Sequence, residues 1–174
     1  MKIILITGGQ RSGKSEEAER MALSLAENPI YIATARIWDE DFLHRVKAHQ
    51  IRRGSQWTNM EEDKFLSRCV INGKVAVIDC VTLWAANWLF DCGEQPSNKD
   101  VTQTFEAMKK EFNKFISQDA TFIFVTNEIG MGGTSGNALQ NKFADLQGLL
   151  NQHIAKIADE VYLMVCGIKV KIKP

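Results

Sequence analysis

The sequence predicts an α/β fold: a mostly parallel β-sheet flanked by helices, with an antiparallel strand at its C-terminal edge. Three observations support this prediction. Short apolar runs rich in β-branched residues recur along the chain, helical stretches separate them, and a glycine-rich loop joins the first run to the first helix. The chain has 174 residues, 45% of them hydrophobic, which suits one full core. We therefore expect a single domain spanning residues 1–174.

The periodicity of apolar residues places the elements in order. We expect strands over residues 2–7, 29–33, 74–79, 120–126, 160–166 and 169–173. We expect helices over residues 16–25, 39–53, 61–69, 83–90, 100–116 and 138–157. The helix 100–116 is strongly amphipathic, and its inner side carries Phe105, Met108, Phe112, Phe115 and Ile116. Because strands and helices alternate, the strands are expected to be mostly parallel and covered on both faces.

The final strand departs from this pattern, because charged and apolar residues alternate along it. Lys169, Lys171 and Lys173 alternate with Val170 and Ile172, which gives the strand one charged face. This alternation is typical of an edge strand, where lysines prevent pairing with a neighbouring molecule. We interpret the three lysines first as protection of the edge and second as phosphate-binding groups.

A phosphate-binding loop follows the first strand. Residues 8–15 match the pattern G-x-x-x-x-G-K-[ST], as Gly8, Gly9, Gln10, Arg11, Ser12, Gly13, Lys14 and Ser15. The glycines let backbone N–H groups turn toward phosphate oxygens, the lysine neutralises their charge, and the serine hydroxyl ligates Mg²⁺. A structural turn could match by chance, but a strand precedes the loop and a helix follows it, as the motif requires. We therefore expect a nucleotide site in a P-loop NTPase-like (RecA-like) domain.

Polar residues also follow two later strands. Asp79 ends the apolar strand 74–79, where a carboxylate can hold Mg²⁺ or its bound water; the alternative is that it caps the next helix. Asn127 and Glu128 follow the strand 120–126 and lead into a glycine-rich loop. The carboxyl ends of parallel strands meet at one crevice, so residues that follow the strands lie there. In the crevice, Asn127 and Glu128 could orient a substrate hydroxyl, a metal-bound water or a base edge. The loop could equally be a mobile lid without direct chemistry.

The histidines give a weaker signal. His44 and His49 lie in one polar stretch with the basic residues Arg45, Lys47, Arg52 and Arg53. A histidine on a solvated helix is usually an ordinary surface residue, so from composition alone a catalytic role for His49 is the less common alternative. We expect His153, on the late helix, to be structural.

Composition restricts the other classes of function. The 21 basic and 21 acidic residues cancel, so the chain lacks the broad positive surface expected for binding nucleic acid. The longest apolar runs are far too short to span a membrane and the N-terminus lacks a signal peptide's features, so we expect a cytoplasmic protein. The four cysteines form no C-x-x-C pair and have no histidine at zinc-ligand spacing. We expect reduced thiols, buried at Cys80 and Cys166, without catalytic chemistry.

Motifs along the whole chain resemble those of the bifunctional adenosylcobinamide kinase and adenosylcobinamide-phosphate guanylyltransferase family. Besides the phosphate loop they are Tyr31-Ile32-Ala33-Thr34, His49-x-x-Arg52-Arg53, Trp57-Thr58, Val77-Ile78-Asp79-Cys80-Val81-Thr82-Leu83-Trp84, Val125-Thr126-Asn127-Glu128-Ile129-Gly130-Met131-Gly132, Asn151-Gln152 and Ala158-Asp159-Glu160-Val161. Two positions depart from the family pattern: Ala144 stands where an arginine is expected, and Lys169 where a proline is common. The first departure bears on phosphate or corrinoid contacts.

The resemblance implies two reactions of cobalamin biosynthesis. ATP or GTP phosphorylates the aminopropanol hydroxyl of adenosylcobinamide, and GMP then passes from GTP to adenosylcobinamide phosphate, giving adenosylcobinamide-GDP. It implies that His49 carries GMP as a covalent phosphoramidate and that Lys14 is the second catalytic residue. The rest of the implied nucleotide site comprises Ala33, Thr34, Ala35, Gln50, Ile51, Arg52, Arg53, Glu61 and Asp79, with Ser15 and Asp79 at Mg²⁺. It also implies a homotrimer.

The chemistry of these residue types is consistent with that role. A neutral imidazole nitrogen can attack the α-phosphorus of GTP, and the phosphate loop can hold the departing pyrophosphate. Arg52 and Arg53 could clamp phosphate oxygens or orient the base. Two other functions remain open: a phosphate-loop small-molecule kinase without a covalent intermediate, and a non-enzymatic, nucleotide-dependent switch.

Overall fold

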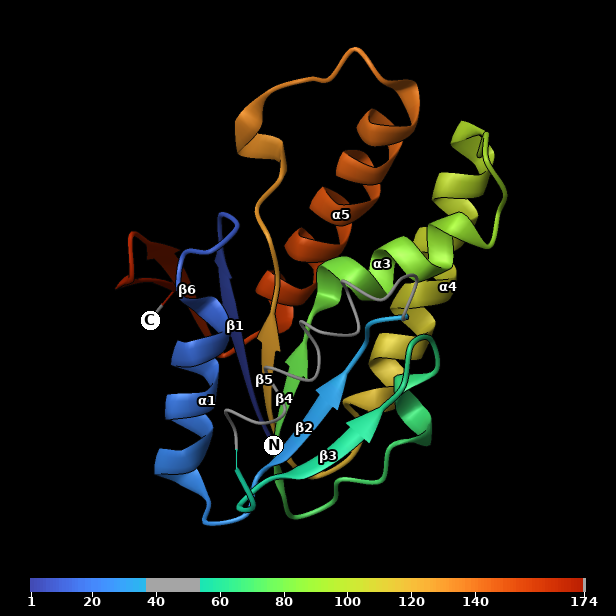
Figure 1. The fold of residues 1–174 in the computed structure, drawn as a ribbon. Helices are drawn as coiled ribbons and strands as arrows, with labels where there is room; N and C mark the ends of the chain where they lie inside the picture. Colours follow the sequence, from blue (N-terminus) through green and yellow to red (C-terminus); the bar gives the residue numbers. More distant parts are fainter. Residues whose placement is uncertain (37–53, 174) are drawn as a thin grey trace.

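The computed structural model describes residues 1–36 and 54–173 (Figure 1). Its strands are β1 (Lys2–Gly8), β2 (Ile30–Ala33), β3 (Thr58–Glu61), β4 (Val75–Asp79), β5 (Thr121–Val125), β6 (Glu160–Val165) and β7 (Ile168–Lys173). Its α-helices are α1 (Lys14–Leu25), α3 (Val81–Phe90), α4 (Asn98–Phe115) and α5 (Ala138–Ile157), and two 3₁₀ turns are η1 (Leu66–Arg68) and η2 (Gly130–Gly132). The helix predicted over residues 39–53 lies outside the described residues.

The strands form one seven-stranded sheet in the order β3-β2-β4-β5-β1-β6-β7. Every neighbouring pair is parallel except β6 and β7, which are antiparallel. The predicted fold class and the antiparallel edge strand are therefore confirmed. The order also places β5 between β1 and β4, so the chain segments that follow these three strands open at the same edge of the sheet.

Helices cover both faces of the sheet, as Figure 1 shows: α1 lies on one face and α3, α4 and α5 lie on the other. The alternation along β1 explains how one strand serves both cores. Ile4 and Ile6 pack with Ala18 and Ala22 of α1, whereas Ile3 and Leu5 join the core beneath the other three helices. Strands buried on both faces read as continuous apolar runs, which is the pattern that predicted them.

The helix α4 begins and packs as its sequence indicates. Ser97 and Asp100 form a reciprocal capping box at its N-terminus, which satisfies backbone N–H groups that have no partner within the helix. Met108, Phe112 and Phe115 are fully buried, and the ring of Phe112 packs against that of Phe124 on β5. The predicted inner face of this helix is therefore confirmed, and it fixes α4 against the sheet.

The region after residue 54 differs from the prediction of a helix over residues 61–69. The chain forms the short strand β3, which pairs in parallel with β2, and then only the single 3₁₀ turn η1. Three of the four β3 residues are exposed, so the strand lacks the apolar alternation that reveals a buried strand. Pairing with β2 decides the conformation here, and local pattern does not.

The lysines of β7 have specific partners. Lys169 pairs with Glu17 of α1 at 2.7 Å, and Lys171 lies 3.8 Å from Glu160. Lys173 donates to three carbonyl oxygens at the end of α5, those of residues 155, 156 and 158, at 2.6 to 3.1 Å. The prediction that β7 is an edge strand is thus confirmed. The three lysines, however, do not share one face of the sheet. Their bonds to α1, β6 and α5 hold the strand in place, besides protecting the edge.

The cysteines fall into two classes. Cys69 and Cys80 are buried, whereas Cys92 and Cys166 are exposed, and all four are free thiols. The prediction of a buried Cys166 is wrong because this residue lies in the turn between β6 and β7, with a φ of 51°. In the part of the chain that the structure describes, no helix has both the length and the apolar character needed to cross a bilayer.

Candidate active site

The phosphate loop joins β1 to α1 and packs tightly against β6. A Cβ at Gly8 would lie 2.4 Å from the carbonyl oxygen of Met164 and 2.9 Å from Oγ of Ser12, and the φ of Gly8 is +148°. Only glycine satisfies both constraints without displacing the backbone. The loop is further held by the Gly167 N–H, which donates to the Ser12 carbonyl at 3.1 Å. Packing against β6 therefore requires glycine at the first position of the motif.

The loop ends at the N-terminus of α1, which has the features of an anion site. Gly13 occupies the N-cap position with a φ of 94°, and no side chain caps the helix. The first amide groups of the helix thus keep their N–H donors for a ligand, and the helix dipole favours negative charge at this end. The arrangement fits phosphate oxygens.

Lys14 is folded back onto the loop. Its Nζ donates to the Gly9 carbonyl oxygen at 2.5 Å and lies 3.4 Å from Oγ of Ser12, and the residue is 7% exposed. Burial lowers the pKa of Lys14 below its usual range, and the nearby groups of Cys80 and Asp79 partly offset this effect. A phosphate would replace the carbonyl as the lysine's partner and restore a full counter-charge.

Asp79 ends β4 beside this lysine. The helix that follows is capped by Cys80, whose Sγ accepts from the Leu83 N–H at 3.4 Å, so the alternative that Asp79 caps α3 is wrong. The Tyr31 hydroxyl of β2 instead donates to Oδ2 of Asp79 at 2.7 Å. This bond fixes the carboxylate at the carboxyl edge of the sheet, within electrostatic range of Lys14.

Further residues of the implied nucleotide site lie at the ends of β2 and β3. Ala33 ends β2, in register with Glu61 of β3 on one side and with Asp79 on the other. Thr34 is fully buried, and its hydroxyl donates to the Cys80 carbonyl at 2.7 Å and accepts from the Cys80 N–H at 2.9 Å. Thr34 therefore locks the end of β2 to the end of β4.

The structure thus gathers most of the predicted site at one edge of the sheet: the phosphate loop, Ala33, Thr34, Ala35, Glu61 and Asp79. The remaining predicted residues lie outside the described residues: His49, Gln50, Ile51, Arg52 and Arg53. Among residues 1–36 and 54–173 no three His, Cys, Asp or Glu side chains group as metal ligands.

The comparisons with known proteins identify the family. The model of the cobinamide kinase / cobinamide phosphate guanyltransferase family matches residues 4–172. This chain belongs to that family of enzymes.

Two curated relatives illustrate the family. The bifunctional adenosylcobalamin biosynthesis protein CobU of Escherichia coli K12 is 35% identical over 181 residues, covering 98% of this chain and 99% of the relative. CobP of Pseudomonas aeruginosa, named likewise as a bifunctional adenosylcobalamin biosynthesis protein, is 33% identical, covering 97% of this chain and 96% of the relative. Among solved structures, an ATPase from the type III secretion system of pathogenic bacteria matches with a TM-score of 0.52 at 14% identity, covering 93% of this chain and 50% of that one. That last likeness shows the shared fold alone.

Within this cobinamide kinase family member, a buried polar network holds the segment after β5. The Asn151 Oδ1 accepts from the Thr126 hydroxyl at 2.7 Å and from Gln147 Nε2 at 2.9 Å, while its Nδ2 donates to the Asn127 carbonyl at 3.1 Å. The Asn127 N–H donates to the Thr82 hydroxyl at 2.8 Å. Both backbone groups of Asn127 are thus held, which fixes the chain that leads to Glu128.

Sequence reasoning missed the roles of Tyr31 and of this network. The available signals were a tyrosine in a buried strand, whose hydroxyl needs a partner, and the polar residues Gln147 and Asn151, four positions apart on the buried side of α5. Neither signal names the partner. The pair Tyr31–Asp79 is brought together by the pairing of β2 with β4, and the pair Thr126–Asn151 by the packing of α5 on the sheet.

Proposed function

We propose that this chain catalyses both reactions of its family within one domain spanning residues 1–174. It phosphorylates adenosylcobinamide with ATP or GTP, and it transfers GMP from GTP to adenosylcobinamide phosphate to give adenosylcobinamide-GDP. The observation that carries the proposal is a phosphate loop with a buried Lys14 beside Asp79, in a chain that matches the family over residues 4–172. Names of the relatives place such enzymes in adenosylcobalamin biosynthesis.

We propose that guanylyl transfer proceeds through His49. Its neutral imidazole nitrogen attacks the α-phosphorus of GTP, the bond to the bridging oxygen breaks, and pyrophosphate leaves. Lys14 and the amides at the start of α1 stabilise the charge that grows on pyrophosphate. Arg52, Arg53 and the residues at the ends of β2 and β3 hold the rest of the nucleotide. An oxygen of adenosylcobinamide phosphate then attacks the same phosphorus, the N–P bond breaks, and GMP moves to the acceptor while the imidazole is regenerated.

Mg²⁺ fits this site because Ser15 and Asp79 offer the oxygen ligands that the ion prefers together with phosphate oxygens and water. When bound, it neutralises charge on the triphosphate. Tyr31 supports this role by fixing one oxygen of Asp79. The hydroxyl of Ser15, in the first turn of α1, lies on the same loop as Lys14.

We also propose a cytoplasmic homotrimer. Resemblance to the family is the main argument for the compartment and for the number of subunits. An exposed apolar row on β7 supports association, because Ile168, Val170 and Ile172 are 67%, 45% and 56% exposed. Light scattering that gave a monomer at assay concentration would contradict this part of the proposal.

The test is incubation of the protein with α-labelled GTP and Mg²⁺, followed by a search for acid-labile, base-stable label on the protein. We expect label on the wild type and none on His49→Ala. His44→Ala is the matched control, because it removes the other histidine of the same stretch and should still be labelled. Undiminished label in His49→Ala would overturn the assignment. Kinase turnover of adenosylcobinamide without any label would instead favour the simple kinase.

A further inference from the structure

A small cavity adjoins the phosphate loop on the face of the sheet that α5 covers. It has a volume of about 230 Å³ and lies between α5 and the strands β1, β6 and β7. Its walls are apolar, from residues such as Leu5 and Val161, while Thr7, Glu128 and Gln152 contribute polar groups. A cavity with an apolar body and a few polar groups suits an aliphatic ligand that carries a hydroxyl or amide.

Two of its polar groups have no partner among residues 1–36 and 54–173. Thr7 is 7% exposed, and its Oγ1 is buried without a hydrogen-bond partner among the described residues. No hydrogen bond or ion pair of the Glu128 side chain exists within the described ranges either, although its backbone N–H donates to the Gly8 carbonyl at 3.1 Å. A buried hydroxyl without a partner is costly, which a ligand would relieve. The backbone bond to Gly8 places Glu128 next to the phosphate loop, and Glu128 lines the cavity there.

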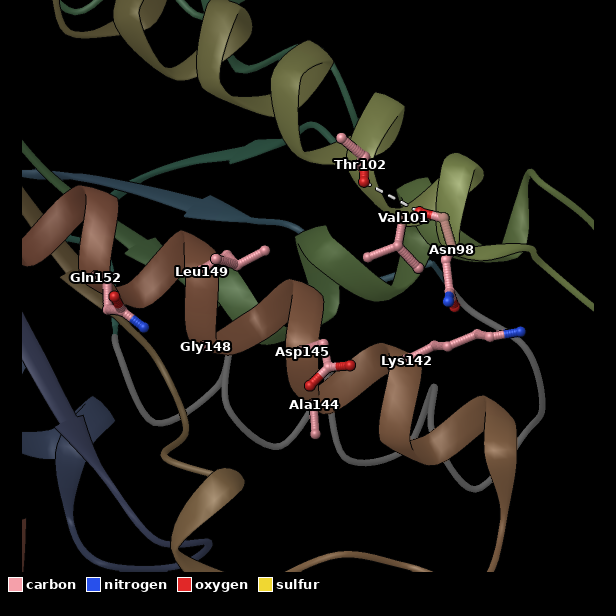
Figure 2. Close-up of a pocket in the computed structure, with 9 residues that line it drawn as sticks. All are labelled: Asn98, Val101, Thr102, Lys142, Ala144, Asp145, Gly148, Leu149 and Gln152. Atoms are coloured by element: carbon pink, nitrogen blue, oxygen red, sulfur yellow. Dashed lines mark hydrogen bonds between the residues drawn. The ribbon is translucent and has the colours of Figure 1, made fainter.

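A second cavity of about 430 Å³ lies further along α5, between this helix and the start of α4 (Figure 2). The two cavities share Gly148 and Gln152 as lining residues, so they adjoin. A Cβ built at Gly148 meets no atom within 4 Å, which shows that this glycine leaves the passage open. Asn98 and Asp145 line the larger cavity with amide and carboxylate groups.

We propose that the two cavities together bind the corrinoid acceptor; this inference rests on the proposed kinase function. The small cavity takes the hydroxypropyl amide arm, whose hydroxyl is the acceptor, and the larger one takes carboxamides of the corrin rim. Size supports this division, because at roughly 30 Å³ per water-sized group the small cavity holds about seven non-hydrogen atoms. An amide arm ending in 2-propanol has that many, whereas a corrin ring is far larger.

The same geometry gives Glu128 a catalytic role in the kinase reaction. Its carboxylate accepts the proton of the acceptor hydroxyl while the hydroxyl oxygen bonds to the γ-phosphorus of ATP. The bond between that phosphorus and the β–γ bridging oxygen breaks, and ADP leaves with its electron pair. Thr7 holds the acceptor hydroxyl in place, and the glycine-rich segment that follows Glu128 lets the nucleotide and the acceptor meet.

The first test uses adenosylcobinamide and ATP with Glu128→Gln and Thr7→Val. We expect Glu128→Gln to lower kcat by about 10²- to 10⁴-fold with a smaller change in the KM for adenosylcobinamide. Thr7→Val keeps the shape of the side chain and should raise that KM roughly three- to tenfold. Both variants should still form the GMP adduct from GTP, since that step needs no corrinoid. Wild-type kcat in Glu128→Gln would overturn its catalytic role.

The second test blocks the passage between the two cavities with a larger side chain at Gly148. Gly148→Leu should raise the KM for adenosylcobinamide at least about tenfold without lowering the melting temperature, because the side chain enters open space on a helix. Lys110→Leu, an exposed position on α4 outside both cavities, is the control and should keep the wild-type KM. A wild-type KM in Gly148→Leu would overturn the proposed site. If the wild type formed neither phosphorylated product nor GMP adduct, the proposed function itself would fail, and the inference with it.

Discussion

Replacing Gly8 by alanine isolates the packing of the phosphate loop against β6. The new Cβ would lie 2.4 Å from the Met164 carbonyl oxygen, a backbone atom, and 2.9 Å from Oγ of Ser12. The serine side chain can rotate, but the carbonyl is held in the sheet by the pairing of Gly8 with Met164. The residue would also need a φ of +148°, which alanine rarely adopts. The strain therefore cannot be relieved by side-chain movement alone.

The expected loss of stability is the sum of two costs, the close contact of the new Cβ and the unfavourable φ. Overpacking against fixed atoms costs about 1–3 kcal/mol, and an unfavourable backbone conformation adds about 1–3 kcal/mol. We expect Gly8→Ala to lower the free energy of unfolding by about 2–6 kcal/mol. For a chain of this size each kcal/mol lowers the melting temperature by about 2–4 °C, so a loss of at least about 4 °C is expected.

The assay is thermal unfolding without nucleotide, so that ligand binding does not contribute. Gly9→Ala is the matched control: it is the neighbouring glycine, its φ is not positive, and its Cβ would meet no atom within 4 Å. Its melting temperature should stay within about 1–2 °C of the wild type. Equal melting temperatures for the two variants would refute the argument that contact with β6 requires glycine at position 8.

Three further predictions test the helix α5, the late histidine His153 and the proposed Mg²⁺ ligand Asp79. Gly148→Ala should raise the free energy of unfolding by about 0.8–1 kcal/mol, measured by denaturant titration, because alanine favours the helix and meets open space. Burial lowers the pKa of His153, so the unfolded chain takes up the proton at a higher pH than the folded chain does. The free energy of unfolding should therefore fall as the pH drops below 6.5, and His153→Gln should make this dependence on pH weaker. Tyr31→Phe removes one hydrogen bond to Asp79 and should cost about 0.5–1.5 kcal/mol of stability and weaken Mg²⁺-dependent GTP binding, both measurable by calorimetry.

The sequence was sufficient for the central strands because these are buried on both faces and therefore continuously apolar. It failed for β3, whose residues Thr58–Glu61 are polar and mostly exposed and are strand only because β2 offers a partner. The lysines of β7 show a second limit. Strict alternation predicts one charged face, but a register shift between Val161 and Tyr162 pairs Lys173 with Val161, so it reaches the end of α5. A bulge of this kind leaves no mark in the alternating pattern.

For the site, the sequence predicted the residues of the phosphate loop and the carboxylate of Asp79, because each belongs to a local pattern with a known chemical role. It could not predict which side chains hold them. Tyr31 reaches Asp79 across 48 positions, and Asn151 reaches Thr126 across 25. Such contacts depend on the order of the strands and on how the helices pack on the sheet, neither of which local periodicity encodes. The same order places Glu128 beside Gly8, where the proposed proton acceptor belongs.

The strand order places the proposed corrinoid cavity away from the edge strand β3. Arg36 follows β2 and Gly54 precedes β3, and these two strands form one lateral edge of the sheet. Arg36 is fixed there by Asp63 and by Asp91, whose Oδ1 lies 2.6 Å from its Nη1. The cavity with Thr7 and Glu128 lies toward the other edge, at β1, β6 and β7. The proposed transfer of GMP from GTP to His49 consumes no corrinoid, so it does not require this cavity. Damage to the corrinoid cavity should therefore abolish phosphorylation and spare the histidine adduct, whereas a single shared entrance would make both reactions fail together.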